Sequence, residues 1–219
     1  MRLLNKIRYK YYRQYVKGYR EAVLSLVDYN PNSLLIDLGC GDASFTSKLM
    51  HKVGANKAWG VDRPRINYEK NIDIIPADLN KPLPIEPGKF DVVCASQIIE
   101  HLSDTDTFLE EIHRILKPNG YLIISTNNLA SWHNIFFLIL GMQPPVAAVS
   151  DGMDKLGARP RHRRIFTFPS LCGILEYHGF KVERVIGSSY YPLPTSLAKL
   201  MCRIDKRHSA CINIRARRV

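Results

Sequence analysis

Cysteines are few in this sequence, and those present do not form pairs. They are odd in number, widely spaced and without a Cys-x-x-Cys motif: Cys40, Cys94, Cys172, Cys202 and Cys211. This arrangement argues against a disulfide framework and against a zinc site made of four cysteines. A small secreted scaffold that depends on disulfides is therefore not expected.

Long apolar runs are also absent. The longest one, Ile135 to Leu140, is far shorter than the roughly 20 residues that a membrane-spanning helix requires. The first residues lack the apolar core of a signal peptide, because charged side chains interrupt them every few positions. We therefore expect a protein that works in the cytoplasm.

Acidic residues are scarce relative to basic ones. The 219 residues include 31 Lys and Arg but 20 Asp and Glu, which gives a formal net charge of +11. This excess lies at the two ends of the chain, in Arg2, Lys6, Arg8, Lys10, Arg13, Lys17, Arg20, Arg203, Lys206, Arg207, Arg215, Arg217 and Arg218. Residues 21–202 are near neutral, so no nucleic-acid partner is expected. The basic N-terminal segment could instead contact an anionic membrane, or it could simply face solvent.

The spacing of apolar residues predicts an α/β fold. Apolar positions recur every three or four residues through residues 1–30, with basic residues opposite, which predicts a basic amphipathic helix. Apolar strand-like segments then alternate with helical ones: strands at 33–38, 57–61, 72–75, 90–95, 121–126, 180–186 and 210–216, and helices at 45–53, 105–116 and 169–178. This order indicates a parallel sheet covered on both faces. Residues 31–219 should therefore form one Rossmann-like, doubly wound domain with a mostly parallel sheet of seven strands.

One segment departs from this alternation. Residues 127–165 are rich in Gly and Pro and show no strand pattern, so we expect an inserted cap over the carboxyl edge of the sheet after the fifth strand. Its apolar side chains would form a lid suited to a lipid-like or aromatic ligand, or they would pack on the sheet. They are Leu129, Trp132, Ile135, Phe136, Phe137, Leu138 and Met142.

A glycine pair and two acids follow successive strands. Gly39 and Gly41 come directly after the first strand, where glycines permit a tight turn and leave room for a ligand. Asp62 ends the second strand, where a carboxylate can accept hydrogen bonds from both hydroxyls of a ribose. Asp78 follows the third strand and could accept a hydrogen bond from an adenine amine. Together these residues predict a nucleoside site.

Two features favour a ligand other than a dinucleotide. Ser44 leaves the motif Gly-x-Gly-x-x-Gly incomplete, and Asp37 lies just before the first glycine. A carboxylate there would repel a pyrophosphate but suits a cationic or zwitterionic ligand. A nucleotide-binding oxidoreductase is therefore disfavoured.

Motifs in a characteristic order extend this pattern over residues 33–126. They are Leu35-Ile36-Asp37-Leu38-Gly39-Cys40-Gly41, Gly60-Val61-Asp62, Pro76-Ala77-Asp78-Leu79, Phe90-Asp91-Val92-Val93, Ile98-Ile99-Glu100-His101-Leu102 and Ile115-Leu116-Lys117-Pro118-Asn119-Gly120-Tyr121-Leu122. With this set the chain resembles the class I S-adenosylmethionine-dependent methyltransferases, in the small-molecule group that includes the ubiquinone and menaquinone biosynthesis enzymes. The motifs are specific for fold and cofactor but not for the acceptor.

The resemblance implies roles for individual residues. The cofactor S-adenosylmethionine would be bound by Asp37, Gly39, Gly41, Asp62, Arg63, Asp78, Leu79 and Gln97. Of these, Gln97 would lie near the transferred methyl group. Ala43 replaces the third glycine of the family's loop, a change that helical backbone angles would tolerate.

The segment after the fourth strand carries the candidate catalytic residues. His101, with Glu100, could take a proton from the acceptor, because imidazole titrates near neutral pH. Alternatively, His101 closes a turn. Some related quinone-precursor O-methyltransferases have Glu where this chain has Gln97 and bind a divalent metal there, so we expect no metal here. His162 and Arg164 could face an acidic substrate or form a solvated loop.

These observations predict methyl transfer from S-adenosylmethionine to a small molecule. The acceptor atom would be an oxygen, nitrogen or carbon. The alternative is a methyltransferase acting on RNA or protein. Ser96 and Gln97 stand where nucleobase amino-methyltransferases usually have an Asn/Asp-Pro-Pro-aromatic box, which weighs against a nucleobase. The sequence predicts no oligomeric state.

Overall fold

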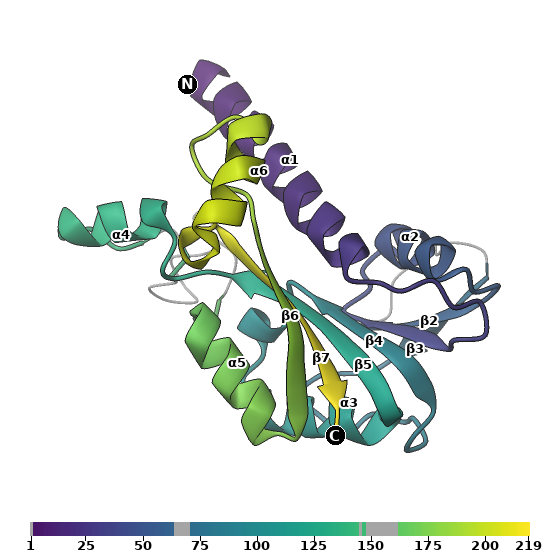
Figure 1. Cartoon of the computed structure of the whole chain (residues 1–219). Helices are drawn as coiled ribbons and strands as arrows, with labels where there is room; N and C mark the ends of the chain where they lie inside the picture. Colours follow the sequence, from purple (N-terminus) through teal and green to yellow (C-terminus); the bar gives the residue numbers. More distant parts are fainter. Residues whose placement is uncertain (1, 64–70, 145, 148–161) are drawn as a thin grey trace.

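The computed structural model describes residues 2–63, 71–144, 146–147 and 162–219, with side chains described from residue 14 onward. A central sheet lies between two layers of helices (Figure 1). The strands are β1 (Leu35–Leu38), β2 (Ala58–Asp62), β3 (Ile72–Pro76), β4 (Phe90–Ser96), β5 (Leu116–Asn127), β6 (Phe180–Ser188) and β7 (Cys211–Arg218). The helices are α1 (Arg2–Ser25), α2 (Ser44–Val53), α3 (Thr105–Ile115), α4 (Trp132–Ile139), α5 (Phe168–Tyr177) and α6 (Thr195–Ile204), with short 3-10 turns at Ile99–His101 and Lys206–His208.

The seven strands have the order β3-β2-β1-β4-β5-β7-β6. β1 pairs in parallel with β2 and β4, and the parallel pairing continues to β3 and β5 at either side. β7 enters between β5 and β6 and is antiparallel to both. The predicted doubly wound, mostly parallel, seven-stranded sheet is therefore confirmed. The strand order reverses at β1, because β2 and β3 lie on one side of it and β4 and β5 on the other, and such sheets bind ligands at the carboxyl ends of the strands beside this point.

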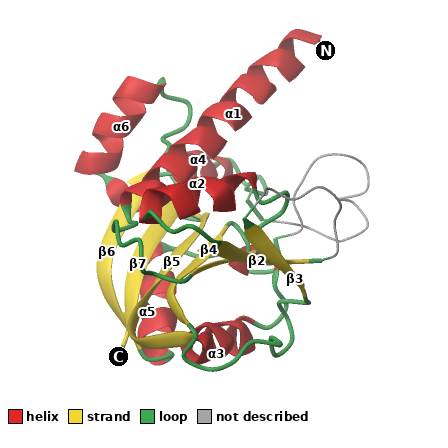
Figure 2. Ribbon diagram, turned by 90° about the vertical axis from the view of Figure 1, so that its right-hand side faces the viewer, coloured by secondary structure: helices red, strands yellow, loops and turns green. Residues whose placement is uncertain are grey.

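Helices cover both faces of the sheet (Figure 2), and each face has its own apolar core. Successive strand residues point to opposite faces, so Leu35 packs with α1 and α2 while Ile36 packs with α3 and α5. Phe108 and Leu171 are buried on the second face, and Leu49 is buried on the first. This alternation explains why the strands are apolar along their whole length.

Several elements differ from the sequence-based expectations. α1 ends at Ser25 rather than near residue 30, and α3 ends at Ile115 because Leu116 already pairs with Phe90 of β4. α4 and α6 are helices that we did not predict. Part of the predicted cap, residue 145 and residues 148–161, lies outside the described residues. Within the described residues, no helix is long and apolar enough to cross a membrane.

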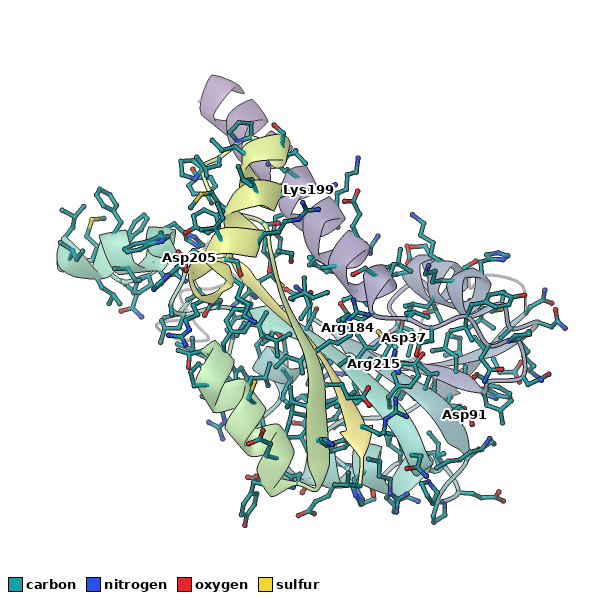
Figure 3. All side chains as sticks on the ribbon, viewed as in Figure 1. Asp37, Asp91, Arg184, Lys199, Asp205 and Arg215 are labelled. Atoms are coloured by element: carbon teal, nitrogen blue, oxygen red, sulfur yellow. The ribbon has the colours of Figure 1, made fainter. Side chains whose placement is uncertain are left out.

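The basic residues near the C-terminus do not all face solvent. Arg215 is buried beneath α1, where Nη1 lies 2.6 Å from Oδ2 of Asp28 and Nε lies 2.9 Å from Oε2 of Glu183 (Figure 3). Its guanidinium also lies 3.9 Å from the ring centroid of Tyr121. Part of the positive charge at the end of the chain therefore stabilises the packing of α1 on the sheet.

Candidate active site

The loop between β1 and α2 opens on the carboxyl edge of the sheet. Gly39 and Gly41 have φ angles of +82° and +59°, a region that glycine enters without a steric penalty. A Cβ atom at Gly39 would lie 3.0 Å from the side chain of Ile98, whereas one at Gly41 would meet nothing within 4 Å. Gly39 therefore packs against the protein, and Gly41 borders open space that a ligand can occupy.

Ala43 does not have the helical backbone angles that the sequence comparison suggested. It has φ 60° and ψ 4°, in the left-handed region, and caps the N-terminus of α2. The left-handed conformation costs a residue with a Cβ roughly 1–2 kcal/mol. The third position of the loop thus keeps a backbone conformation that favours glycine even though glycine is absent.

Asp62 connects the loop to β2. Its Oδ2 accepts a hydrogen bond from the Gly41 amide at 2.7 Å, and its Oδ1 accepts one from the Arg63 amide at 2.7 Å. The amides of Gly39 and Cys40 donate to the carbonyl of Val61 at 2.8 and 3.2 Å. The carboxylate predicted to bind a ribose therefore lies beside the glycine at which the loop is open.

Asp78 and Leu79 follow β3 on the same edge. Asp78 is exposed, and its Oδ1 accepts hydrogen bonds from the backbone and side-chain nitrogens of Asn80 at 3.0 and 2.9 Å. These bonds hold the pKa of the Asp78 carboxyl below its ordinary value, so it is ionised at neutral pH. Leu79 is buried, and the amide of Ser103 donates to Oδ1 of Asn80 at 2.8 Å.

Asp37 lies beneath the loop rather than at its surface. Its carboxylate is 3% exposed and accepts a 2.7 Å hydrogen bond from Oγ1 of Thr46 in the first turn of α2. Burial raises the pKa of Asp37 to about 6, although the hydrogen bonds from Thr46 and Cys94 oppose the shift. This arrangement fixes α2 relative to β1 and so positions the glycine loop.

A cluster of hydrogen-bonded polar side chains lies past the carboxyl ends of β4 and β5. Gln97 has a φ angle of +57°, unusual for a residue with a side chain, and its amide nitrogen donates to Oγ of Ser125 at 3.2 Å. The Tyr15 hydroxyl lies 2.8 Å from Oε1 of Gln97 and 2.5 Å from Oδ1 of Asn127. Tyr15 and Asn127 are not among the predicted site residues, because their contact depends on how α1 packs.

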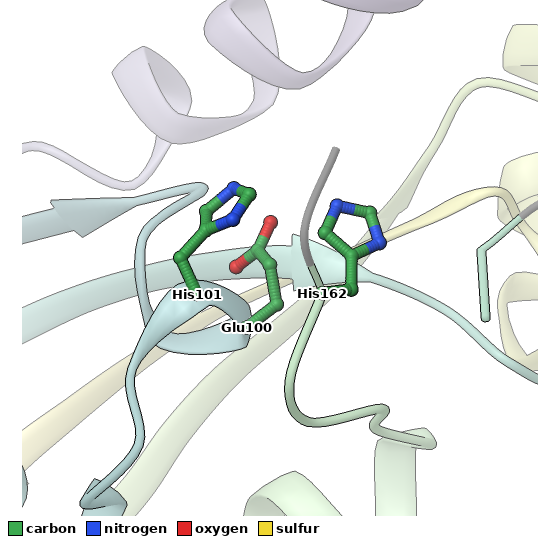
Figure 4. Close-up of side chains that lie close together, drawn as sticks. All are labelled: Glu100, His101 and His162. Carbon is green, nitrogen blue, oxygen red and sulfur yellow. The ribbon is translucent and has the colours of Figure 1, made fainter. Parts of the chain in front are cut away.

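Glu100, His101 and His162 converge beside this group (Figure 4). Each offers a ligand atom within 4.8 Å of the others, and the two imidazole rings lie 5.1 Å apart. The buried Glu100 accepts hydrogen bonds from Oγ1 of Thr126 at 2.8 Å and Nδ2 of Asn127 at 3.2 Å, and burial raises the pKa of its carboxyl. The two predicted catalytic residues and one predicted substrate residue thus share one site.

Hydrogen bonds fix the orientation of His162. Its Nδ1 lies 2.8 Å from the carbonyl oxygen of Val146, so Nδ1 is the donor, and in the neutral imidazole Nε2 is then the acceptor. The other predicted substrate residue, Arg164, is directed elsewhere: its Nη2 donates to the carbonyl of Ser103 at 2.9 Å. The backbone amides of Arg163 and Arg164 donate to the carbonyl of Glu100, which attaches this segment to the turn carrying His101.

The same three side chains form a donor set of the kind that holds a divalent metal. Two imidazoles and a carboxylate are typical zinc ligands. In this chain, however, Gln97 supplies no second carboxylate beside Glu100. The absence of a metal remains a prediction.

The sequence of this chain is similar to those of known methyltransferases. A family model described as a methyltransferase domain matches residues 9–185. A ubiquinone biosynthesis O-methyltransferase of Colwellia psychrerythraea is 29% identical over 81% of this chain and 72% of its own length. A mitochondrial enzyme of the same name from Dictyostelium discoideum is 29% identical over 57% of this chain, a match that spans 45% of that relative.

A solved structure extends the similarity to the fold. An S-adenosylmethionine-dependent methyltransferase from Mesorhizobium loti superimposes with a TM-score of 0.65 at 20% identity, over 90% of this chain and 96% of the other. The sheet order, the glycine loop and the match to the family model lead to one conclusion. The chain belongs to the methyltransferase domain family and has the Rossmann-like fold of this solved methyltransferase.

Proposed function

We propose that this protein transfers the methyl group of S-adenosylmethionine to an oxygen or nitrogen of a small, aromatic or lipid-like acceptor. One observation supports this proposal above others. The open loop at Gly41 and the cluster of Glu100, His101 and His162 lie past carboxyl ends of the same sheet, the first at β1 and the second beyond β4. A cofactor held at the first would direct its methyl group toward the second.

The residues of the loop suit S-adenosylmethionine. Gly41 has open space where a side chain would stand, and Asp62 and Asp78 supply carboxylates at the ends of β2 and β3 for the ribose and the adenine. Gly39 would contact the methionine part. When bound, the cofactor supplies a methyl group on a sulfonium that is already an activated leaving group.

The polar cluster suits an acceptor that loses a proton. A hydroxyl or amine that gains a methyl group must release its hydrogen, and the imidazole of His101 can accept it. Glu100 lies beside His101 and stabilises the imidazolium once it forms, since opposite charges at short range favour the charged state. His162, with Nδ1 held by Val146, directs Nε2 toward the cluster and can accept a hydrogen bond from the acceptor.

The class of acceptor follows from similarity and from the cap. The relatives named ubiquinone biosynthesis O-methyltransferases act, by their names, on quinone precursors, which supports an aromatic acceptor with a hydroxyl group. We extend this to an apolar or lipid-like substituent because the segment after β5 is strongly apolar. The cytoplasmic location expected from the sequence is part of the same proposal.

Two measurements test this function. S-adenosylmethionine and its demethylated product should each raise the melting temperature, whereas NAD should not. If neither adenosyl ligand changes the melting temperature, the cofactor assignment is wrong. Metabolite extracts incubated with methyl-labelled cofactor, with products scored by mass, should yield a labelled small molecule. Label found in RNA or protein alone would favour the alternative acceptor class.

A further inference from the structure

Exposed apolar side chains gather on two helices at one end of the molecule. Ten of the fourteen large apolar side chains that are exposed in the described part of the chain belong to α4, α6 and the loops beside them, which we call the α4–α6 surface. They are Trp132, Phe136, Leu138, Ile139, Leu140, Met142, Tyr191, Leu197, Leu200 and Ile204. Ile139 is 76% exposed and Phe136 is 59% exposed, so these side chains do not pack on the sheet. Exposed apolar patches of this kind mark interaction sites.

Side-chain contacts join the two helices. Nε1 of Trp132, at the start of α4, donates to Oδ2 of Asp205 at the end of α6 over 3.0 Å. The rings of Trp132 and His208 lie 4.5 Å apart, and those of His133 and Tyr191 lie 5.7 Å apart. Figure 1 shows α4 extending away from the sheet at the end of the molecule where α6 lies. The exposed apolar side chains therefore project outward from one region instead of lining a groove.

The charges beside this surface are positive. Residues 128–144 contain no charged side chain, whereas Arg203, Lys206 and Arg207 are exposed at the end of α6 and just after it. The acid in this segment, Asp205, is directed inward, where its carboxylate accepts hydrogen bonds from Trp132 and from the Tyr190 hydroxyl at 2.7 Å. The α4–α6 surface thus combines an apolar projection with a cationic border.

α1 also contacts this end of the molecule. Its sequence from residue 2 to residue 13 has five basic residues and no acid. α1 passes beside α6 (Figure 1), where Nε2 of Gln14 donates to the carbonyl of Leu193 at 3.1 Å. α1 therefore contacts this region at Gln14, and its residues before Gln14 extend away from α6 (Figure 2).

We propose that the α4–α6 surface docks on an anionic lipid membrane. A bilayer interface accepts projecting apolar side chains without a complementary groove, and its anionic headgroups attract Lys and Arg at the border. A second copy of the chain fits less well, because a two-fold interface would bring the cationic borders of both copies into the same interface. The apolar acceptor proposed above would be taken from the lipid phase at this end, but docking itself does not depend on that function.

Flotation with lipid vesicles tests the proposal. The full chain should float with vesicles that contain phosphatidylglycerol, and less with vesicles of phosphatidylcholine alone. The variant Phe136→Ser/Ile139→Ser should weaken this binding about tenfold or more, because each apolar side chain contributes through its buried methylene groups. Arg203→Gln/Arg207→Gln should weaken binding to phosphatidylglycerol by about fivefold for each charge removed.

A matched control distinguishes docking through this surface from nonspecific adsorption of exposed apolar side chains to vesicles. Tyr177, at the C-terminal end of α5, is 83% exposed and lies at the far end of the molecule, so Tyr177→Ser should bind vesicles like the wild type. Since all substituted positions are exposed, unchanged melting temperatures should show that the variants fold. Wild-type protein that does not float, or Phe136→Ser/Ile139→Ser protein that floats equally well, would overturn the proposal. So would sedimentation data in which the same variant converts a dimer to a monomer without changing vesicle binding.

Discussion

The hydroxyl oxygen of Tyr15 lies 2.5 Å from Oδ1 of Asn127, although the two residues are 112 positions apart in the chain. The same oxygen lies 2.8 Å from Oε1 of Gln97, and because a tyrosine has one O–H, it can donate to one of these oxygens at a time. Burial, together with the nearby Cys211 and Glu100, holds the pKa of Tyr15 well above its ordinary value. The hydroxyl is therefore protonated at neutral pH and links α1 to the ends of β4 and β5.

Replacing Tyr15 by Phe should lower the free energy of unfolding by about 1–3 kcal/mol, because a buried amide oxygen loses its donor. It should also slow methyl transfer and weaken cofactor binding, since Gln97, one of the residues predicted to bind the cofactor, would no longer be held in place. Urea unfolding and initial rates measure these effects. Tyr29→Phe is the control, because Tyr29 is 73% exposed. A Tyr15→Phe protein with wild-type stability would show that the Tyr15 hydrogen bond does not contribute to the free energy of unfolding.

Asp62→Ala should weaken binding of S-adenosylmethionine at least about tenfold, because the ribose loses a charged acceptor and the Gly41 amide loses its partner. Calorimetric titration gives the dissociation constant. Asp73→Ala is the matched control, since Asp73 lies on β3 in an exposed ion pair with Lys57, 2.6 Å from Oδ2 to Nζ. Equal affinities for the wild type and Asp62→Ala would refute the ribose role.

His101→Ala should reduce turnover by about 10²–10⁴-fold if the imidazole removes the acceptor proton. Cofactor affinity should be unchanged, because His101 belongs to the acceptor end of the site. His51→Ala, on the exposed side of α2, should leave turnover at the wild-type level. Wild-type turnover in His101→Ala would mean that this histidine only closes the turn.

The buried Asp37 should make stability depend on pH. Its folded pKa of about 6 lies above the ordinary value of 3.8, so the folded state binds the proton more tightly than the unfolded state does. The contribution of Asp37 is then fully present below about pH 4 and is lost as pH rises through about 6, a change of up to about 3 kcal/mol.

Asp37→Asn separates this effect from other titrations. Asn keeps an oxygen that can accept from Thr46 but does not ionise. Urea unfolding gives the free energy of unfolding of each protein. The value for Asp37→Asn should therefore rise relative to that of the wild type between pH 4 and pH 7. A difference that does not change with pH would contradict the assignment.

Removal of metal should not change activity. With Gln97 in place of a carboxylate, we expect equal methylation rates with and without EDTA. The same assay after addition of Zn²⁺ or Mg²⁺ to EDTA-treated protein is the control. Activity lost to EDTA and restored by either ion would instead assign Glu100, His101 and His162 as ligands.

Local patterns were sufficient to predict the sheet. β1 to β4 are short apolar segments, so their type and approximate positions follow from residues close in sequence, whereas β5 is longer and begins at Leu116, five residues before the predicted strand. Gly39 and Gly41 after β1 predicted the open loop for the same reason, because a left-handed turn depends on the residue itself. Asp62 and Asp78 could be assigned to one edge because parallel strands end on the same side of a sheet.

Local patterns were insufficient where a role depends on packing. α6 is an exception, since Leu197, Leu200 and Ile204 recur at helical spacing and the helix could have been predicted from them. Asp37 was predicted to bind the cofactor, but its carboxylate is buried under α2 and bonded to Thr46. The exposure of Phe136 and Ile139 could not be read from their apolar character, which is typical of a core.

The sequence by itself determined the fold class, the glycine loop and the acids at the strand ends, because these depend on short-range periodicity and on backbone preferences. Tertiary structure alone decided that Tyr15 reaches Gln97 and Asn127, that His162 joins Glu100 and His101, and that α4 and α6 present their apolar side chains outward. Each of these relationships joins segments far apart in the chain. Such contacts form when α1 and the segment after the cap pack on the finished sheet, and local preferences carry no information about that packing.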